Sequence, residues 1–165
     1  MRIEKLCAEQ WRRYRAIRLR ALADAPDAFA RSLSEEETFL EEDWRKRLSS
    51  RGNTFIANID GQDIGVATGA ACKGRAESAG LYGMWVAPEG RRQGIGLSLV
   101  MAVIKWARST GYDQLVLDVS ENNSPAIKLY KKAGFKPLGE PSILHPDCEH
   151  IMKLSCQFHS RRPTK

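Results

Sequence analysis

A glycine-rich turn at residues 86–96, with the sequence VAPEGRRQGIG, follows a strand-like run and opens an apolar helical pattern. Backbone N–H groups at a helix N-terminus have no intrahelical acceptor, and the helix dipole concentrates positive charge there, so such an end binds phosphate oxygens. Gly94 and Gly96 have no Cβ and allow an anion to approach successive N–H groups closely. Arg91 and Arg92 add charged donors. The turn predicts a phosphate cradle, although the same glycines are also typical of a tight turn without a ligand.

Two better-known phosphate motifs are excluded at this turn. A Walker A loop places Lys and then Ser or Thr after its last glycine, whereas Leu97 and Ser98 follow Gly96. A dinucleotide-binding loop needs glycine at the position of Leu99. The cradle is therefore expected to hold a different phosphate ligand.

The cysteines and histidines do not form a metal-binding pattern. The cysteines lack C-x-x-C pairing, and the histidines lack the four-residue spacing of ligands on a helix. Cys148, His150 and Cys156 lie near one another in the sequence, where an alternating strand with buried thiols explains them. We therefore expect no metal, and free thiols at Cys7, Cys72, Cys148 and Cys156.

The positive charge of the chain does not indicate a nucleic-acid-binding protein. The net charge is +6, but basic residues are interleaved with acids and no run combines aromatic with basic residues. The lysines at 128, 131, 132 and 136 either solvate a helix face or, together with the cradle, attract a compact anionic cofactor. No apolar stretch resembles a signal peptide or a membrane span, so we expect a cytoplasmic location without membrane contact.

The elements that must position the turn follow the order strand, two helices, three strands, helix, strand, helix, two strands. A capping box at Ser34 and Glu37 predicts the start of the second helix, which runs to about Leu48. The three consecutive strands predict an antiparallel meander, and the strand–helix–strand crossover at the turn predicts a mixed sheet. We expect a mixed α/β fold of about seven strands and four helices, with a single domain at 1–155 and a polar tail at 156–165.

A second motif lies one strand beyond the turn. Residues 129–135 read LYKKAGF, and Asn123 stands seven residues before Tyr130. The Arg-x-x-Gly-x-Gly string alone is moderately specific, but its combination with this motif at this separation is highly specific. Over about residues 1–155, and most closely over 81–135, the chain resembles the GNAT superfamily of N-acetyltransferases.

The resemblance implies the GNAT acyl-CoA N-acyltransferase fold, acetyl-CoA as the acyl donor and no metal. It also implies that the pyrophosphate of coenzyme A lies in the cradle, while the pantetheine arm pairs with one strand. The cofactor-binding residues implied are Trp85, Val86, Arg91, Arg92, Gln93, Gly94, Ile95, Gly96, Leu97, Ser98 and Asn123.

The resemblance further assigns the chemistry to Tyr130. Attack of an amine on the thioester expels a thiolate, and a phenol with a pKa near about 10 remains protonated at neutral pH and can protonate it. The alternative is that Tyr130 only packs at the end of a helix. A backbone N–H, that of Val86, is expected to polarise the thioester carbonyl.

The general base stays open at the level of sequence. Relatives that use a strand carboxylate carry it several residues before the position of Val86, but residues 79–82 contain no acid. Ordered water assisted by Tyr82 or by backbone carbonyls is one alternative, and Glu77 and Glu121 are others.

The acceptor implied by the resemblance is a primary amine on a small molecule or a peptide, acetylated by direct attack in a ternary complex. The acidic runs at 35–37 and 41–43 either attract this cation or simply favour a helix start. A non-catalytic GNAT-fold module that binds acetyl-CoA or regulates another process is the alternative function. Ile151, Met152 and Leu154 serve either a homodimer or the core of a monomer.

Overall fold

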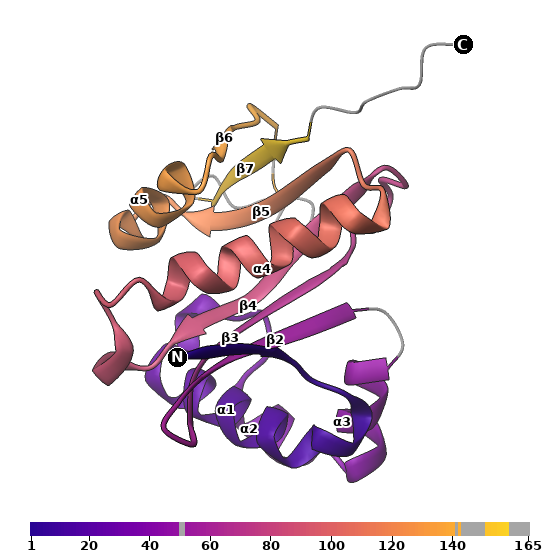
Figure 1. Ribbon diagram of the computed structural model, residues 1–165, viewed down its shortest axis with the longest axis vertical. Helices are drawn as coiled ribbons and strands as arrows, with labels where there is room; N and C mark the ends of the chain where they lie inside the picture. Colours follow the sequence, from indigo (N-terminus) through magenta and orange to yellow (C-terminus); the bar gives the residue numbers. More distant parts are fainter. Residues whose placement is uncertain (50–51, 141, 143–150, 159–165) are drawn as a thin grey trace.

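The computed structural model describes residues 1–49, 52–140, 142 and 151–158 and contains one seven-stranded sheet (Figure 1). The strand order is β1-β2-β3-β4-β5-β7-β6, and every neighbouring pair is antiparallel except β4 and β5. The predicted mixed α/β fold is confirmed. The strands are β1 Arg2–Lys5, β2 Gly52–Ile59, β3 Gln62–Ala71, β4 Ser78–Val86, β5 Gln114–Ser120, β6 Lys136–Pro137 and β7 Ile151–Gln157.

The helices form two layers around this sheet (Figure 1). The long helix α4 and the shorter α5 pack on one face, whereas α1 and α3 pack on the other. The α-helices are α1 Trp11–Asp24, α2 Leu33–Glu37, α3 Glu41–Ser49, α4 Ile95–Thr110 and α5 Ser124–Lys132, and the 3-10 turns are η1 Ala8–Gln10, η2 Pro26–Ala28 and η3 Pro88–Gly90.

The second predicted helix differs from the structure, because it is divided into α2 and α3. The capping box uses Ser32 and Glu35: the Glu35 N–H donates to Ser32 Oγ at 3.2 Å, and the Ser32 N–H donates to Glu35 Oε2 at 2.8 Å. Helix α2 ends at Thr38, whose hydroxyl donates to the Glu35 carbonyl at 2.7 Å. The next helix, α3, begins directly after Leu40, whose N–H donates to the Asp43 carboxylate at 2.9 Å.

The last strand extends further than the sequence pattern indicates. Strand β7 continues through Gln157, so it includes the first residues of the predicted tail, and Cys156 is buried in the core. Leu154 is also fully buried, because β7 lies between β5 and β6. It therefore belongs to the core of a single chain.

Several predicted features are settled only for the described residues. Cys7, Cys72 and Cys156 are free thiols. Cys148 and the three histidines lie outside the described residues. In the residues that are described, no three His, Cys, Asp or Glu side chains gather so as to hold a metal ion. None of the helices within those ranges is long and apolar enough to cross a lipid bilayer.

The close approach of α4 to the sheet depends on Gly69 in β3. A Cβ at Gly69 would lie 2.5 Å from the Trp106 ring and 2.8 Å from Val103 Cγ1. Since both partners are on α4, even one methyl group would push the helix away from the sheet. The sequence of β3 thus fixes the depth at which α4 sits.

This packing predicts that Gly69→Ala is destabilising. We expect the free energy of unfolding in urea to fall by about 1–3 kcal/mol, because the added methyl group overpacks the interface. Ala71→Val, at an exposed position of the same strand, is the matched control and is expected to change stability by less than about 0.5 kcal/mol. Wild-type stability of Gly69→Ala would contradict this account of the packing.

Candidate active site

The strands β4 and β5 separate after the third residue of each. They pair in parallel at only three positions, of which the last joins Gly80 to Val116. Beyond this point β4 continues to Val86 and β5 to Ser120. Residues 81–86 therefore present an edge of roughly 20 Å that has no β5 partner. Such an edge can pair with an extended ligand as another strand would.

A β-bulge in β4 accompanies this separation. On the neighbouring strand Thr68 is paired with Tyr82 and Val66 with Trp85, so two residues of β4 stand opposite one of β3. Gly83, at the bulge, has φ of 59°, which a residue with a side chain rarely adopts. A bulge bends the strand and increases its twist, which turns β4 away from β5.

The alternation along β4 determines which main-chain groups face the open edge. The Ala87 N–H donates to the Ile64 carbonyl at 2.8 Å, which makes this a hydrogen-bonded pair with β3. Trp85, two residues earlier, therefore directs its main chain at β3, whereas Val86 directs its own at the open edge. The Val86 carbonyl accepts the Arg91 Nε–H at 3.0 Å. The Val86 N–H is thus the donor that remains for a ligand.

The N-terminus of α4 lies at the end of this strand edge, as the glycine turn predicts. Gly94 is the N-cap residue with φ of 78°, and the first bond of the helix runs from the Ser98 N–H to the Gly94 carbonyl at 3.1 Å. The N–H groups of residues 95–97 therefore lack intrahelical acceptors. A Cβ at Gly94 would meet nothing within 4 Å, so open space lies beside the turn. This geometry suits an anion.

The side chains of the cradle bind the protein itself. Gln93 Nε2 donates to the Glu89 carbonyl at 2.8 Å, and Ser98 Oγ donates to the Gly94 carbonyl at 3.2 Å. Arg91 forms an ion pair with Asp24, while Arg92 is exposed and has φ of 62°. The main chain and the exposed Arg92 are thus the groups of the cradle left to bind a ligand.

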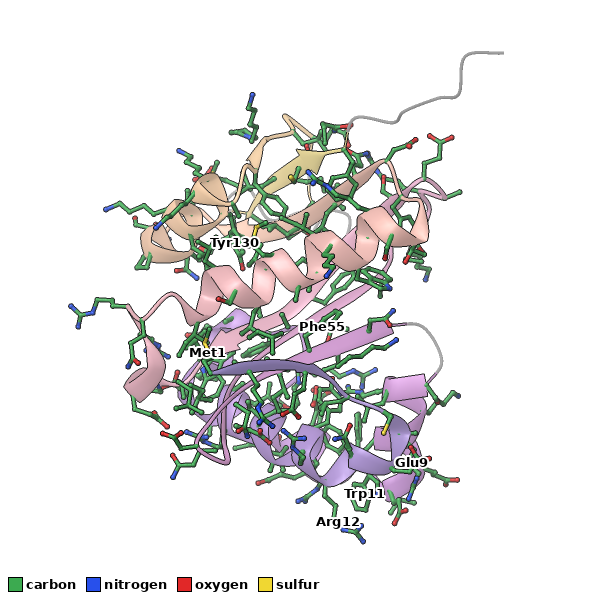
Figure 2. The ribbon with its side chains drawn as sticks, in the orientation of Figure 1. Met1, Glu9, Trp11, Arg12, Phe55 and Tyr130 are labelled. Atoms are coloured by element: carbon green, nitrogen blue, oxygen red, sulfur yellow. The ribbon has the colours of Figure 1, made fainter. Side chains whose placement is uncertain are left out.

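Tyr130 lies between α5 and α4 (Figure 2). It is 7% exposed, and its ring packs against Phe135 with centroids 5.8 Å apart. Helix α5 approaches the cradle closely, because a Cβ at Gly96 would be 3.0 Å from Leu129 Cδ2. Burial raises the pKa of Tyr130 to about 12, so its hydroxyl stays protonated at neutral pH.

Asn123 is the N-cap residue of α5. Its Oδ1 accepts the Ala126 N–H at 3.3 Å, which leaves the side-chain NH2 group as a donor. The sequence motif that links Asn123 and Tyr130 therefore reflects one helix, with the cap at its start and the phenol near its end.

Two of the sequence candidates for the general base point away from the open edge. The Tyr82 ring lies over Gly80, at the last paired position. Burial, with smaller contributions from Cys72 and Asp118, raises the pKa of Tyr82 to about 12. Glu77 precedes β4 at its closed end, where its carbonyl accepts the Asp113 N–H. Glu121 follows β5 at the open end and is exposed.

The sequence reasoning missed Asp118. It lies on β5 two residues beyond Val116, so on its face of the sheet it is the first β5 side chain past the separation from β4. Asp118 Oδ2 accepts the Ser142 hydroxyl at 2.6 Å, but Oδ1 is buried and has no hydrogen-bond partner among the described residues. The available signal was a single acid in the apolar run LVLDV at 115–119.

Lys153 on β7 stands directly opposite Asp118. Lys153 is 4% exposed, and its Nζ likewise has no hydrogen-bond partner in the described part of the chain. Buried polar groups without partners are costly, so this face of β5 and β7 is suited to a polar ligand or to water.

The chain matches the Acetyltransferase (GNAT) family over residues 6–135. It is 33% identical over 130 residues to the mouse protein named "Probable N-acetyltransferase family 8 member 5". It is 32% identical over 124 residues to the mycothiol acetyltransferase of Thermobispora bispora. These alignments cover 75% and 73% of this chain, but only 56% of the mouse protein and 41% of the bacterial one.

Solved structures share the whole fold at low sequence identity. The protein yncA of Salmonella typhimurium, solved with its cofactor acetyl-CoA, is similar with a TM-score of 0.78 and 15% identity, covering 100% of this chain and 98% of that one. A GNAT-family acetyltransferase of Streptococcus pneumoniae is similar with a TM-score of 0.78 and 19% identity, covering 95% and 98% of the two chains. These structures show the shared fold, and the family match over residues 6–135 shows that the chain belongs to the Acetyltransferase (GNAT) family.

Proposed function

We propose that this chain is an acetyl-CoA-dependent N-acetyltransferase that acetylates a primary amine of a small molecule or a peptide by direct attack in a ternary complex. The observation that carries the proposal is the unpaired β4 edge with the α4 cradle at its end, where Leu129, the neighbour of Tyr130 on α5, approaches Gly96. The names of its N-acetyltransferase relatives support the activity, and the acetyl-CoA in the Salmonella structure supports the donor.

The donor site follows from main-chain groups. Backbone N–H groups of residues 93–97 bind the pyrophosphate, with the α4 dipole adding to the attraction, whereas the Ser98 N–H is used by the first bond of the helix. The pantetheine arm lies along β4, where the Val86 N–H is free, and the Asn123 NH2 group contacts it from α5. Because Trp85 directs its main chain at β3, its part is to hold Val86 in place through the sheet.

The transfer step needs one proton removed and one proton supplied. The acceptor ammonium first loses a proton, and the free amine nitrogen then bonds to the thioester carbon while the carbon–sulfur bond breaks. The Val86 N–H stabilises the negative charge that develops on the carbonyl oxygen. Tyr130 gives its proton to the departing thiolate and regains one from solvent after the product leaves.

Asp118 is the group that we assign to proton removal. Its Oδ1 is without a hydrogen-bond donor and lies on the strand that borders the separation, on the face opposite α4. The Ser142 hydroxyl orients the carboxylate through Oδ2. An acceptor ammonium, or a water that relays its proton, supplies the missing donor.

The rival function is a module that binds acetyl-CoA without turnover. Release of free thiol from acetyl-CoA, measured against polyamines, aminoglycosides, amino acids and peptides, separates the two. Steady release with one amine class supports the enzyme, whereas tight acetyl-CoA binding with no release across the panel supports the binding module.

Tyr130→Phe tests the general acid. We expect kcat to fall by about 10²–10⁴-fold, the usual contribution of a positioned acid, with the Kd for acetyl-CoA nearly unchanged. Tyr112→Phe is the matched control, because Tyr112 packs against Trp106 beyond the far end of α4. Undiminished turnover in Tyr130→Phe would remove this residue from the chemistry.

Asp118→Asn tests proton removal through its dependence on pH. We expect kcat/KM to fall by about 10²-fold at neutral pH and to recover as the pH rises, because an aliphatic amine with a pKa near about 10 then loses its proton in solution. Tyr130 does not limit the alkaline arm, since its pKa is raised to about 12. Asp113→Asn, at the closed end of β5, is the control. A wild-type-to-variant ratio that stays constant with pH would contradict the assignment.

A further inference from the structure

A buried cluster of two arginines and one glutamate lies beside the β4 bulge. Glu36 of α2 is fully buried and accepts hydrogen bonds from Arg18 Nε at 3.0 Å and Nη2 at 2.8 Å. Arg47 of α3 donates to the same carboxylate at 2.9 and 3.2 Å. Burial by itself raises the pKa of Glu36, but the hydrogen bonds and charges of both arginines outweigh it and hold the pKa below its usual value. Glu36 is therefore ionised, and because both arginines already occupy its carboxylate, it does not attract a further cation.

The cluster carries one uncompensated positive charge, because two guanidinium groups face one carboxylate. Both terminal nitrogens of Arg47 bind Glu36, and its guanidinium lies over the Phe39 ring at 4.8 Å. Arg47 therefore uses both terminal nitrogens within the helical layer, and the excess charge is shared by the two guanidinium groups. Arg18 is the one of the two that stands against β4.

Arg18 keeps one nitrogen free. Nη1 makes no hydrogen bond within the described residues, and it would lie 3.4 Å from a Cβ at Gly83, so it stands against the bulge of β4. The side chain is 12% exposed, and the guanidinium packs over the Phe29 ring at 4.5 Å. Glu36 and Phe29 hold the guanidinium in place, so Nη1 is a preorganised donor on the α1 side of the sheet.

Two groups of charges on this side of the sheet border the opening and the bulge. Asp118 and Lys153 stand opposite one another on β5 and β7 and balance in charge. Arg18 adds a positive group next to the bulge, on the same side of the sheet as α1. The side chain of Trp85 is also on this side, since its indole N–H donates to Asp24 of α1 at 2.9 Å. An acceptor entering here meets a carboxylate at the strand separation and a guanidinium at the bulge.

We propose that the acceptor carries a carboxylate close to its amino group, as an α-amino acid does, and that Arg18 Nη1 binds this carboxylate. This inference rests on the proposed function, since it names the class of amine that the transferase accepts. A guanidinium N–H donates to a carboxylate in a charge-assisted hydrogen bond, and the single excess charge of the cluster matches a single carboxylate. The amino group of the same molecule then extends toward Asp118 and the thioester.

The first experiment uses the wild-type protein and matched acceptors. Thiol release from acetyl-CoA is measured with L-phenylalanine, phenylalanine amide and phenethylamine, and the rates are compared per free-base amine. We expect kcat/KM for the amino acid to exceed that for the other two by about 10–100-fold, the range for a hydrogen bond to a charged group. L-lysine and cadaverine repeat the comparison with a second side chain.

The second experiment removes the binding group while preserving the net charge of the cluster. The double variant Arg18→Gln/Glu36→Gln deletes one positive and one negative charge and leaves Arg47 unopposed in the helical layer. We expect it to lose most of the preference for the amino acid over the amine. Arg12→Gln is the matched control, because Figure 2 shows Arg12 on the outer side of α1, pointing away from the sheet, and it is expected to keep the preference.

The outcomes separate this inference from the function on which it rests. If phenethylamine and the amide react as well as L-phenylalanine, the carboxylate site is overturned and the N-acetyltransferase function stands. If no amine of either kind releases thiol, both are overturned. Should the double variant fail to fold, the wild-type comparison of the three phenylalanine-derived acceptors decides alone.

Discussion

The structure depends on one unusual constraint, a strand in the interior of a sheet whose edge is left unpaired. Beyond Gly80 the main chain of β4 has no β5 partner, although the sheet resumes on the far side through β5, β7 and β6. An unpaired edge inside a protein is costly unless a ligand or water satisfies it, so it persists only where the surroundings hold it open. The bulge at Gly83 bends β4, and α4 packs against the sheet next to the opening. A ligand that pairs with the edge completes the sheet.

The two faces of the sheet present different chemical groups around this opening. On the face of α4 and α5 the site is made from main-chain donors, a helix dipole and a buried phenol. On the opposite face it is made from side-chain charges on α1, β5 and β7. The first set suits a large anionic donor with an extended arm, and the second suits a small molecule that carries both charges. The sheet thus keeps the two sets of groups apart on its opposite faces.

Burial shapes the chemistry of the ionisable groups. Tyr130 loses contact with water and so keeps its proton over a wide range of pH, which suits a group that must donate it. Glu36 is equally buried but gains hydrogen bonds from two arginines, so it keeps its charge and fixes Arg18 against the bulge. The sequence alone does not show that Glu36 is the member of its acidic run that is buried.

The sequence by itself determined the fold class and the local elements beside the opening on the α4 face. The glycine turn, the helix that follows it, and the cap and phenol of α5 are each local, because a helix start depends on residues within a few positions. The start of the second helix is ambiguous in the sequence, because two S-x-x-E spacings overlap there. Only the structure shows that Ser32 and Glu35 form the cap.

Only the tertiary structure decided the acceptor side. Arg18, Asp118 and Lys153 come from α1, β5 and β7, and no spacing in the chain relates them. The opposition of Asp118 and Lys153 depends on the register between β5 and β7, and the position of Arg18 depends on the bulge that brings Gly83 against it. These are long-range pairings, whereas sequence patterns report the periodicity of one element at a time. The local pattern thus determined the glycine turn and the helix that it begins, and the packing of distant elements decided which charged side chains lie on the opposite face of the sheet.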